Sequence, residues 1–598
     1  MKFAKNFCAY LAAPILALCV ITLFYQLWNC DLSKPVFGYG QDTLFHVFVI
    51  KTIISSGWFF YNNFVGYPQI DGAIFSLQDF PIHADSFNFL VIKIFSLFTS
   101  DAFLITNLFF IFTFCFISFT SFIALRAFNF SIVTALAISL IYAFTPYHLL
   151  RNVWHLFLSN YAAIPLVVMV AIWIAQNKIQ LLVLNEKKCL HFAPNRFFFF
   201  ALLVAIFVAT NGVYYACYSC AVFVFAWFLR GLNQGKFLDF QAFNVVALCA
   251  IIVGVLAILY FPAFVYWSTN GFNKEVANRD PSGSEYHALH IIDLFLPVVN
   301  HYIYYFSKLH LMFDEALVGG ERDAENLGLV AAVGFLFLLL WIIAKSQNSP
   351  NSVMQRTIQK YALSNEEESL ISNLAGLNLL SILFATVGGF VMFVALPFPL
   401  LRSHARFCIF IAFFSLFLMA IIFDKISRDR ILAKFVIIAI TALALLDQVG
   451  RLDSNTRNLM QKDFAIDREF VEKVEANMPQ NSQIFVLPVF GFPEEMGDEY
   501  ESLVFYLHSK NLYWSYPTIL ARPSNIWQKK TFALGNKKFI EEIKKAGFSG
   551  VVIDRMHFAK SEKKNGWEKL RKMEKALEDV SKTKPQVSKD MRLSFFKF

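Results

Sequence analysis

Residues 102–125 read AFLITNLFFIFTFCFISFTSFIAL, a stretch without a single charged side chain. A helix needs about 20 consecutive, mostly apolar residues to cross the hydrocarbon core of a bilayer. Because the bilayer core holds no water, a crossing segment must bond its own backbone, as a helix does. We therefore expect residues 102–125 to form a transmembrane helix.

The whole chain has the composition of a membrane protein. Of its 598 residues, 57% are hydrophobic and only 16% are charged, and the mean hydropathy is +0.52. Soluble domains are closer to half apolar. The net charge of +9 is spread along the chain. The sequence contains no dense Lys/Arg block of the kind that binds nucleic acid.

The apolar pattern recurs along the chain, and we expect about eleven transmembrane helices. The first is interpreted as uncleaved, because its apolar run is too long for a signal peptide and no small-x-small site follows it. Asn211-Gly212, after one of the shorter runs, is either a tight turn or a break within the membrane. The expected spans are 7–28, 102–125, 131–146, 156–175, 197–211, 213–230, 243–267, 327–344, 373–396, 405–423 and 431–448.

Lys and Arg residues set the orientation, because cytoplasmic loops of membrane proteins are enriched in them. Their distribution here favours a cytoplasmic N-terminus. An odd number of spans then places residues 449–598 outside, after a transmembrane domain of residues 1–448. The lipid bilayer is thus the first partner of this chain.

Two of the expected outer loops are long, residues 29–101 and 268–326. Within the first, residues 43–58 and 84–98 have helical apolar spacing but are too short and too interrupted to cross a membrane. We expect these two helices to lie in the membrane interface.

Residues 449–598 have the alternating pattern of an α/β domain. The predicted helices are 463–477, 537–546 and 567–580, and the predicted strands are 482–488, 549–554 and 592–598. The acidic and His side chains of this part match neither a zinc site nor a nucleophile elbow. We expect them on a solvated face; they are Glu494, Glu495, Asp498, Glu499, His508, Asp554 and His557.

The segment after the first span reads FGYGQDTLFH, residues 37–46, and places Asp42 where the first interfacial helix begins. Residues 77–85 of the same loop read LQDFPIHAD and supply Asp79 and Asp85. Acidic residues and a His around one loop suit acid/base chemistry or cation binding. Because Asp is a favoured N-cap, helix capping is the alternative for Asp42 and Asp85.

Cationic candidates cluster near two further span ends. His148, Arg151 and His155 recur at i, i+3 and i+7, so we expect them on one helical face. They suit an anionic head group, with snorkelling in an aromatic belt as the alternative.

The segment LRSHARF, residues 401–407, joins the ninth and tenth spans. Arg402 and Arg406 are expected one helical turn apart, on the outer side, where positive charge is scarce. Because the guanidinium fork matches phosphate geometry, this pair is predicted to bind a phosphate.

These motifs together resemble the GT-C superfamily of membrane glycosyltransferases, and within it a bacterial branch related to the YfhO-like family. Residues 40–46, followed by Gly57-Trp58 and Gly66-Tyr67-Pro68, are similar to the first outer loop of that family, which carries its catalytic Asp. Residues 402–407 are similar to its late loop near the lipid phosphate. One departure is Thr43, where the protein-mannosylating branch has Glu.

The resemblance implies a GT-C-like helical membrane domain in the bacterial inner membrane, with an extracytoplasmic C-terminal domain. It implies a polyprenyl-phosphate sugar donor and an envelope glycan, lipid or protein acceptor. Asp42 would take the proton of the acceptor hydroxyl, with inversion at the anomeric carbon. An Arg, or a divalent cation such as Mg²⁺ or Mn²⁺, would stabilise the leaving phosphate. The candidate binding residues are His46, Asp79, Asp85, His148, Arg151, His155, Arg402, His404 and Arg406.

Two other function classes stay open. A transporter or flippase for lipid-linked sugars would have related halves, or broken helices with charges at mid-membrane. The sequence shows neither feature clearly. A non-catalytic membrane protein of envelope assembly is the other alternative.

Overall fold

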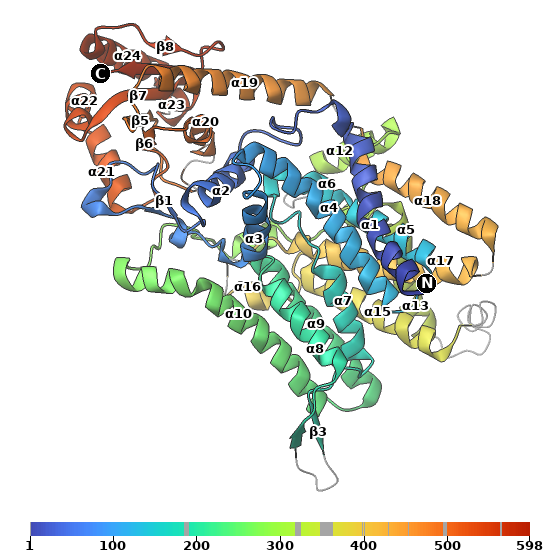
Figure 1. The fold of residues 1–598 in the computed structure, drawn as a ribbon. Helices are drawn as coiled ribbons and strands as arrows, with labels where there is room; N and C mark the ends of the chain where they lie inside the picture. Colours follow the sequence, from blue (N-terminus) through green and yellow to red (C-terminus); the bar gives the residue numbers. More distant parts are fainter. Residues whose placement is uncertain are drawn as a thin grey trace.

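Figure 1 presents the fold of the chain as a computed structural model. The structure describes residues 2–184, 190–237, 239–316, 324–346, 363–397, 399, 401–428, 430–451, 454–493, 495, 499–562 and 565–598.

The membrane part is a bundle of apolar helices. In the described part of the chain, eight helices are long and apolar enough to cross a membrane, and three shorter apolar helices accompany them. Each coincides with one predicted span, so the prediction of a polytopic helical protein is confirmed. The helices are α1 (Lys2–Tyr25), α4 (Ala102–Arg126), α5 (Ile132–Ala143), α7 (Ile164–Ala175), α8 (Arg196–Ala209), α9 (Val213–Gln234), α10 (Phe240–Asn270), α13 (Leu329–Ser346), α15 (Asn365–Ala385), α17 (Cys408–Ser427) and α18 (Ile431–Val449).

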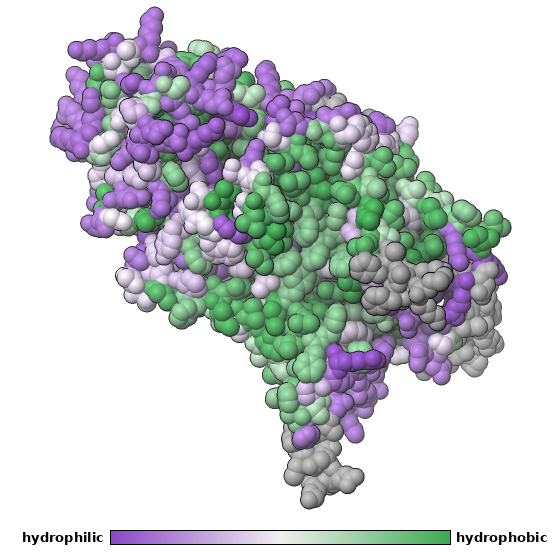
Figure 2. Space-filling view, in the orientation of Figure 1, coloured by the Kyte–Doolittle hydropathy of each residue, from purple (hydrophilic) through white to green (hydrophobic). Residues whose placement is uncertain are grey.

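Helix α17 forms the centre of this bundle, with α5, α7, α13, α15 and α18 around it. In contrast, α10 and α18 expose large apolar side chains, among them Val253, Phe261 and Leu443 at 60%, 64% and 66%. Figure 2 shows a broad hydrophobic surface over the helical part and a mainly hydrophilic surface over the C-terminal part. An apolar surface of this extent is stable against lipid and not against water.

Two predicted spans have different bounds in the structure. Residues 156–163 form turns, and α7 begins after them with Pro165 in its first turn, where a missing N–H is tolerated. The span predicted to start at residue 373 starts eight residues earlier, because Ser364 and Glu367 form a capping box. It ends before Gly388, whose φ of +67° favours glycine.

The first long loop carries two helices, α2 (Asp42–Ser56) and α3 (Ser86–Phe95). That both lie in the membrane interface stays a prediction. Helix α2 is enclosed by protein: residues Thr43 to Ile50 are all buried, because α4 and η5 pack on α2 from the membrane part and η8 and α20 from the C-terminal part (Figure 1). Helix α3 does expose an apolar face, with Leu90 and Ile94 at 52% and 48%.

Shorter elements complete the loops. They are α6 (Pro146–Arg151), α11 (Ser282–Tyr286), α12 (Tyr304–Ala316), α16 (Met392–Ala395), the 3-10 turns η5 (Val153–His155), η7 (His404–Phe407) and η8 (Glu499–Leu503), and the paired strands β1 (Tyr61–Asn62) with β2 (Phe75–Ser76) and β3 (Leu182–Leu184) with β4 (Leu190–Phe192).

The C-terminal part is an α/β domain, and the six helices and strands predicted in it are confirmed. Its sheet has the order β6 (Tyr513–Trp514), β5 (Gln483–Leu487), β7 (Phe548–Asp554), β9 (Leu593–Lys597) and β8 (Gln586–Val587). Strand β5 is parallel to β6 and β7, and β9 is antiparallel to β7 and β8. The helices are α19 (Ser454–Ala476), α20 (Val504–His508), α21 (Pro523–Phe532), α22 (Asn536–Lys545), α23 (Arg555–Ser561) and α24 (Gly566–Ser581).

The prediction of a solvated polar face is wrong for His508 and Asp554, which are 9% and 0% exposed. His508 lies where the domain meets the first long loop, and Asp554 supports that contact. Charged and aromatic side chains cover both residues. Glu494 and Asp498 lie outside the described residues.

The first long loop and the C-terminal domain are joined by backbone and side-chain contacts. The Trp514 N–H donates to the Phe64 carbonyl at 2.9 Å, which adds a loop segment to the edge of the sheet. Lys51 in α2 donates from Nζ to the carbonyls of Tyr506, Leu507 and Ser509 at 2.6, 3.0 and 2.6 Å. These bonds cap the end of α20, where the Tyr506 carbonyl also accepts the Ser509 N–H.

Asp79 takes part in a buried ion pair between the two parts of the chain. Arg522 donates from Nε and Nη2 to the two Asp79 oxygens, each at 2.7 Å, and the Asp79 side chain is 0% exposed. Trp267 Nε1 adds a bond of 3.1 Å. The binding role predicted for Asp79 stays a prediction, since its carboxylate here holds the loop to the C-terminal domain.

We expect Arg522→Ala to destabilise the protein by about 3–5 kcal/mol, because it leaves a buried carboxylate without its cation. The double variant Arg522→Ala/Asp79→Asn should be less destabilised than Arg522→Ala alone, since the unpaired charge is gone. Thermal unfolding of the detergent-purified protein measures both. Equal losses in the single and double variants would contradict this interpretation.

Candidate functional site

Asp42 is the first residue of α2, and it follows a turn of unusual backbone geometry. Gly40 has a φ of +94°, and Gln41 has a φ of 46° and a ψ of −135°. The N-cap is Gln41, and its side chain makes no capping bond. The alternative that Asp42 is the N-cap is therefore wrong. Its carboxylate is 48% exposed, and its negative charge is favoured at the positive end of the helix dipole.

Two His side chains lie near the Asp42 carboxylate. His155 Nδ1 is 3.9 Å from Asp42 Oδ2. His46, one helical turn after Asp42, bonds through Nε2 to the Trp154 carbonyl at 3.1 Å. Burial lowers the pKa of His46 to about 3, although the bond to Trp154 opposes this. His46 is thus neutral and ties α2 to η5.

The close approach of η5 to the loop before Asp42 requires a glycine. A Cβ on Gly38 would lie 2.6 Å from Val153 Cγ2. Asn152 closes the same contact, because its Nδ2 donates to the Phe37 carbonyl at 2.6 Å. The turn that carries Asp42 and the turn that carries His155 are therefore packed directly on each other.

The predicted common face of His148, Arg151 and His155 does not exist. The helix is interrupted at Asn152, whose φ is 48° and ψ is −154°, so His155 belongs to the separate turn η5. His148 is fully buried, stacks on Phe114 at 3.7 Å, and bonds to Thr113. Its binding role stays a prediction that this burial does not favour.

Arg151 and Arg406 belong to one buried cluster with tyrosines. Arg151 Nη2 is 3.3 Å from Glu325 Oε1, and its guanidinium lies 5.3 Å from the centre of the Tyr147 ring. The guanidinium of Arg406 lies 4.6 Å from the centre of the Tyr214 ring. The charges of both arginines act on the Tyr147 hydroxyl. We call Arg151, Arg406, Tyr147, Tyr214 and Glu325 the arginine–tyrosine cluster.

The prediction that Arg402 and Arg406 lie one helical turn apart is wrong. Residues 401–403 are not helical. The Tyr218 hydroxyl donates to the Ser403 carbonyl at 2.9 Å. Arg402 instead lies beside Gly283 of α11, and His404 is buried near Tyr218. The binding roles of Arg402 and His404 stay predictions.

Asp85 lies at the junction of the loop with α8 and α9. The Gly212 N–H donates to the Ala84 carbonyl at 3.0 Å, and Asn88 Nδ2 is 3.4 Å from Asp85 Oδ1. Burial raises the pKa of Asp85 to about 7, although the bond from Asn88 opposes this. Residues 210–212 form a tight turn between α8 and α9, which pack on each other.

Sequence reasoning missed two carboxylates close to the site. Glu325 pairs with Arg151, and it is the last of three acids, with Glu321 and Asp323, at the polar end of the loop before an apolar span. Glu501 accepts the Gln41 N–H at 2.7 Å, one residue before Asp42. Within the acid-rich run 494–501, nothing in the sequence distinguishes Glu501 from its neighbours.

The predicted divalent cation finds no ligand set among the described residues. In that part of the chain, no group of three or more His, Cys, Asp or Glu side chains could hold a metal ion. Asp42 and His155 alone do not make a cation site of the kind that Mg²⁺ or Mn²⁺ occupies.

Comparisons with known proteins find similarity only to solved structures. No family model matches the chain, and no curated protein matches it. The archaeal oligosaccharyltransferase AglB from Archaeoglobus fulgidus, in complex with an inhibitory peptide and a dolichol-phosphate, has a TM-score of 0.39 at 12% identity, covering 96% of this chain and 73% of that chain.

Two further solved structures are similar over most of this chain. Arabinofuranosyltransferase AftD from Mycobacteria has a TM-score of 0.40 at 11% identity, covering 91% of this chain and 36% of that chain. ArnT from Cupriavidus metallidurans, bound to undecaprenyl phosphate, has a TM-score of 0.33 at 11% identity, covering 99% of this chain and 98% of that chain.

We expect Asp85→Asn to stabilise the protein more at pH 8 than at pH 5. The pKa of Asp85 is raised from 3.8 to about 7 in the folded state. Its ionisation therefore costs stability progressively as the pH rises from about 4 to 7. Asn is uncharged at both pH values, as the protonated acid is, so the variant avoids that cost.

Thermal unfolding at both pH values measures this effect, with Asp71→Asn as the matched control. Asp71 lies in the same loop but is exposed, at a φ of 54° that Asn readily adopts. A gain of equal size at pH 5 and pH 8 in the Asp85 variant would show that burial does not shift its ionisation.

Proposed function

We propose that this chain is a membrane glycosyltransferase that moves a sugar from a polyprenyl-phosphate donor to a hydroxyl group of an envelope glycan, lipid or protein. One observation carries the proposal. A half-exposed Asp42 carboxylate at a helix start lies 3.9 Å from His155, next to the turn that leads back to Arg151. A base and a phosphate-binding cation are the two groups that such a transfer needs.

Asp42 acts on the acceptor in this proposal. Its carboxylate takes the proton of the acceptor hydroxyl while the hydroxyl oxygen bonds to the anomeric carbon of the sugar. The bond from that carbon to the phosphate oxygen breaks, and its electron pair stays on the phosphate. A single displacement of this kind inverts the anomeric centre. His155 Nδ1, at 3.9 Å from Asp42 Oδ2, is within ion-pair range of the carboxylate and beyond hydrogen-bond distance.

Arg406 is the proposed partner of the leaving phosphate. Its guanidinium lies 4.6 Å from the centre of the Tyr214 ring, a cation–π contact. A guanidinium fork can bind two phosphate oxygens at once. Arg151 is engaged by Glu325, so we assign it to holding the cluster together. Because the cluster is buried, its positive charge acts on the phosphate with little screening by water.

The proposed location is the bacterial inner membrane, with residues 449–598 on the outer side. The Lys/Arg distribution supports this orientation. The outer face also explains the donor class, since nucleotide sugars are absent there and a lipid-linked sugar must serve instead. The donor class is taken from the family that the sequence motifs resemble.

We expect Asp42→Asn to lower transfer about 100- to 10,000-fold, because Asn cannot accept the proton. Expression and thermal stability should stay near those of the unmodified protein, because the side chain is 48% exposed. The assay is transfer of radiolabelled sugar from polyprenyl-phosphate donors in membranes that contain the protein. Asp71→Asn serves as the control, and full activity of the Asp42 variant would remove Asp42 from the chemistry.

We expect Arg406→Lys to raise the KM for the donor about tenfold or more while kcat changes less, because Lys keeps the charge and loses the fork. Arg402→Lys is the companion variant. It should have a smaller effect, because Arg402 lies beside α11 and not among the tyrosines. A larger effect at Arg402 than at Arg406 would indicate that the phosphate binds on the α11 side.

A further inference from the structure

The turn that carries Asp42, residues 38–42, needs external support. Gly40 and Gln41 both have positive φ, and Gln41 has a ψ of −135°, a combination that side chains other than glycine rarely adopt. Such a conformation costs of the order of 1–3 kcal/mol and persists only where the surroundings hold it. The direction of the Asp42 side chain depends on this turn, because Asp42 is the next residue.

Two carboxylates of the C-terminal domain hold the turn, one on each side of Gly40. Glu501 of η8 accepts the Gln41 N–H at 2.7 Å. Asp467 of α19 accepts the Tyr39 hydroxyl at 2.8 Å. We call Glu501 and Asp467 the carboxylate clamp. Both residues come from a part of the chain more than 400 positions away from the turn.

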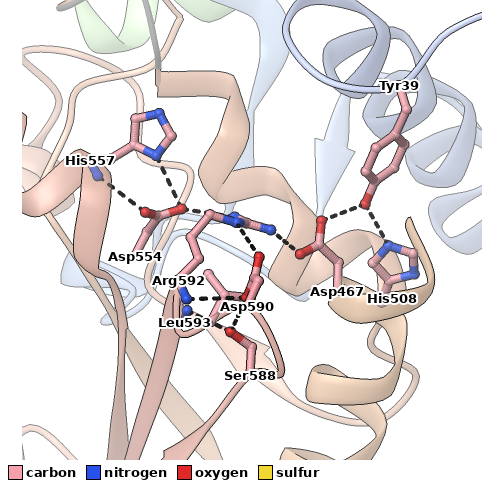
Figure 3. Close-up of polar contacts among 9 residues, drawn as sticks. All are labelled: Tyr39, Asp467, His508, Asp554, His557, Ser588, Asp590, Arg592 and Leu593. Carbon is pink, nitrogen blue, oxygen red and sulfur yellow. Dashed lines mark hydrogen bonds and ion pairs between the residues drawn. The ribbon is translucent and has the colours of Figure 1, made fainter. Parts of the chain in front are cut away.

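Asp467 is itself fixed by a buried network of charges. Figure 3 shows Arg592 lying between Asp467 and Asp554, with Tyr39 and His508 on the far side of Asp467. Arg592 Nη1 is 3.0 Å from Asp554 Oδ2, and Arg592 Nη2 pairs with Asp467. His508 Nε2 is 3.0 Å from the Tyr39 oxygen. Because Tyr39 donates to Asp467, His508 is the donor to Tyr39.

Burial affects Asp467 and Asp554 differently. It raises the pKa of Asp467 to about 7, although Arg592 and the bond from Tyr39 oppose this. Burial opposes the ionisation of Asp554, but His557 and Arg592 outweigh it and hold the pKa of Asp554 below its usual value. The carboxylates Asp467 and Asp554 raise the pKa of Arg592 in turn, against the effect of burial. A network of this kind is rigid, because each member that moves leaves another charge unpaired.

We propose that Glu501 and Asp467 are positioning residues for Asp42, so that the C-terminal domain sets the geometry of the transfer site. This inference rests on the proposed function. The clamp acts on the start of α2, while the bonds of Lys51 hold a position nine residues later in the same helix. Loss of Glu501 therefore leaves the helix in place and frees only its first turn.

The test compares Glu501→Ala with Glu501→Gln, because the Gln amide oxygen can still accept the Gln41 N–H. We expect Glu501→Ala to lower kcat about 10- to 100-fold with the donor KM nearly unchanged, as a misplaced catalytic group does. Glu501→Gln should restore most of kcat. Glu568→Ala, in an exposed ion pair on α24, is the matched control and should leave kcat unchanged.

Hydrogen exchange measured by mass spectrometry gives a second readout that needs no activity. Amide exchange in residues 38–44 should rise in Glu501→Ala and in Tyr39→Phe, and should stay low in Glu501→Gln and Glu568→Ala. Thermal unfolding should stay near that of the unmodified protein in Glu501→Ala.

Unchanged exchange and unchanged kcat in Glu501→Ala would overturn the inference. A Glu501→Gln variant as inactive as Glu501→Ala would also overturn it, because the charge and not the hydrogen bond would then matter. If the unmodified protein transfers no sugar from any polyprenyl-phosphate donor, the proposed function fails, and the exchange data still decide whether the clamp holds the turn.

Discussion

The burial of α2 is the constraint on which the rest of this structure depends. An apolar helix that cannot cross a bilayer must bury its surface in lipid head groups or in protein. Here it is enclosed between the membrane helices and the C-terminal domain. The burial of α2 determines where the C-terminal domain lies, which loop segment joins its sheet, and where the carboxylate of Asp42 points.

The charged contacts around α2 explain why the two parts of the chain act as one body. Asp79 and Arg522 form an ion pair removed from water between the loop and the domain, and Asp467, which pairs with Arg592 inside the domain, accepts the Tyr39 hydroxyl of the loop. Breaking such a pair leaves an uncompensated charge, so separating the domain from the loop would cost far more than the loss of surface contacts. The domain is therefore better understood as one wall of the site than as an appended module.

The sequence predicts the parts of this protein that depend on local pattern. Apolar runs locate the membrane helices, and periodicity locates the helices and strands of the sheet domain. The sequence does not predict the break at Asn152, because a single residue with positive φ does not change an amphipathic pattern. It also cannot predict that Glu501 reaches Gln41, because that contact joins segments brought together only by tertiary packing. Asp42 stood out because glycines precede it.

The central claim is that donor phosphate and acceptor base meet between the arginine–tyrosine cluster and Asp42. The most direct measurement is a cryo-EM structure of the protein in lipid nanodiscs with a bound polyprenyl phosphate. The account predicts density for the phosphate at the guanidinium of Arg406, on the side of η5 that faces Asp42 and His155. Phosphate density bound elsewhere, with Arg406 still enclosed by tyrosines and Asp42 remote from the head group, would contradict it.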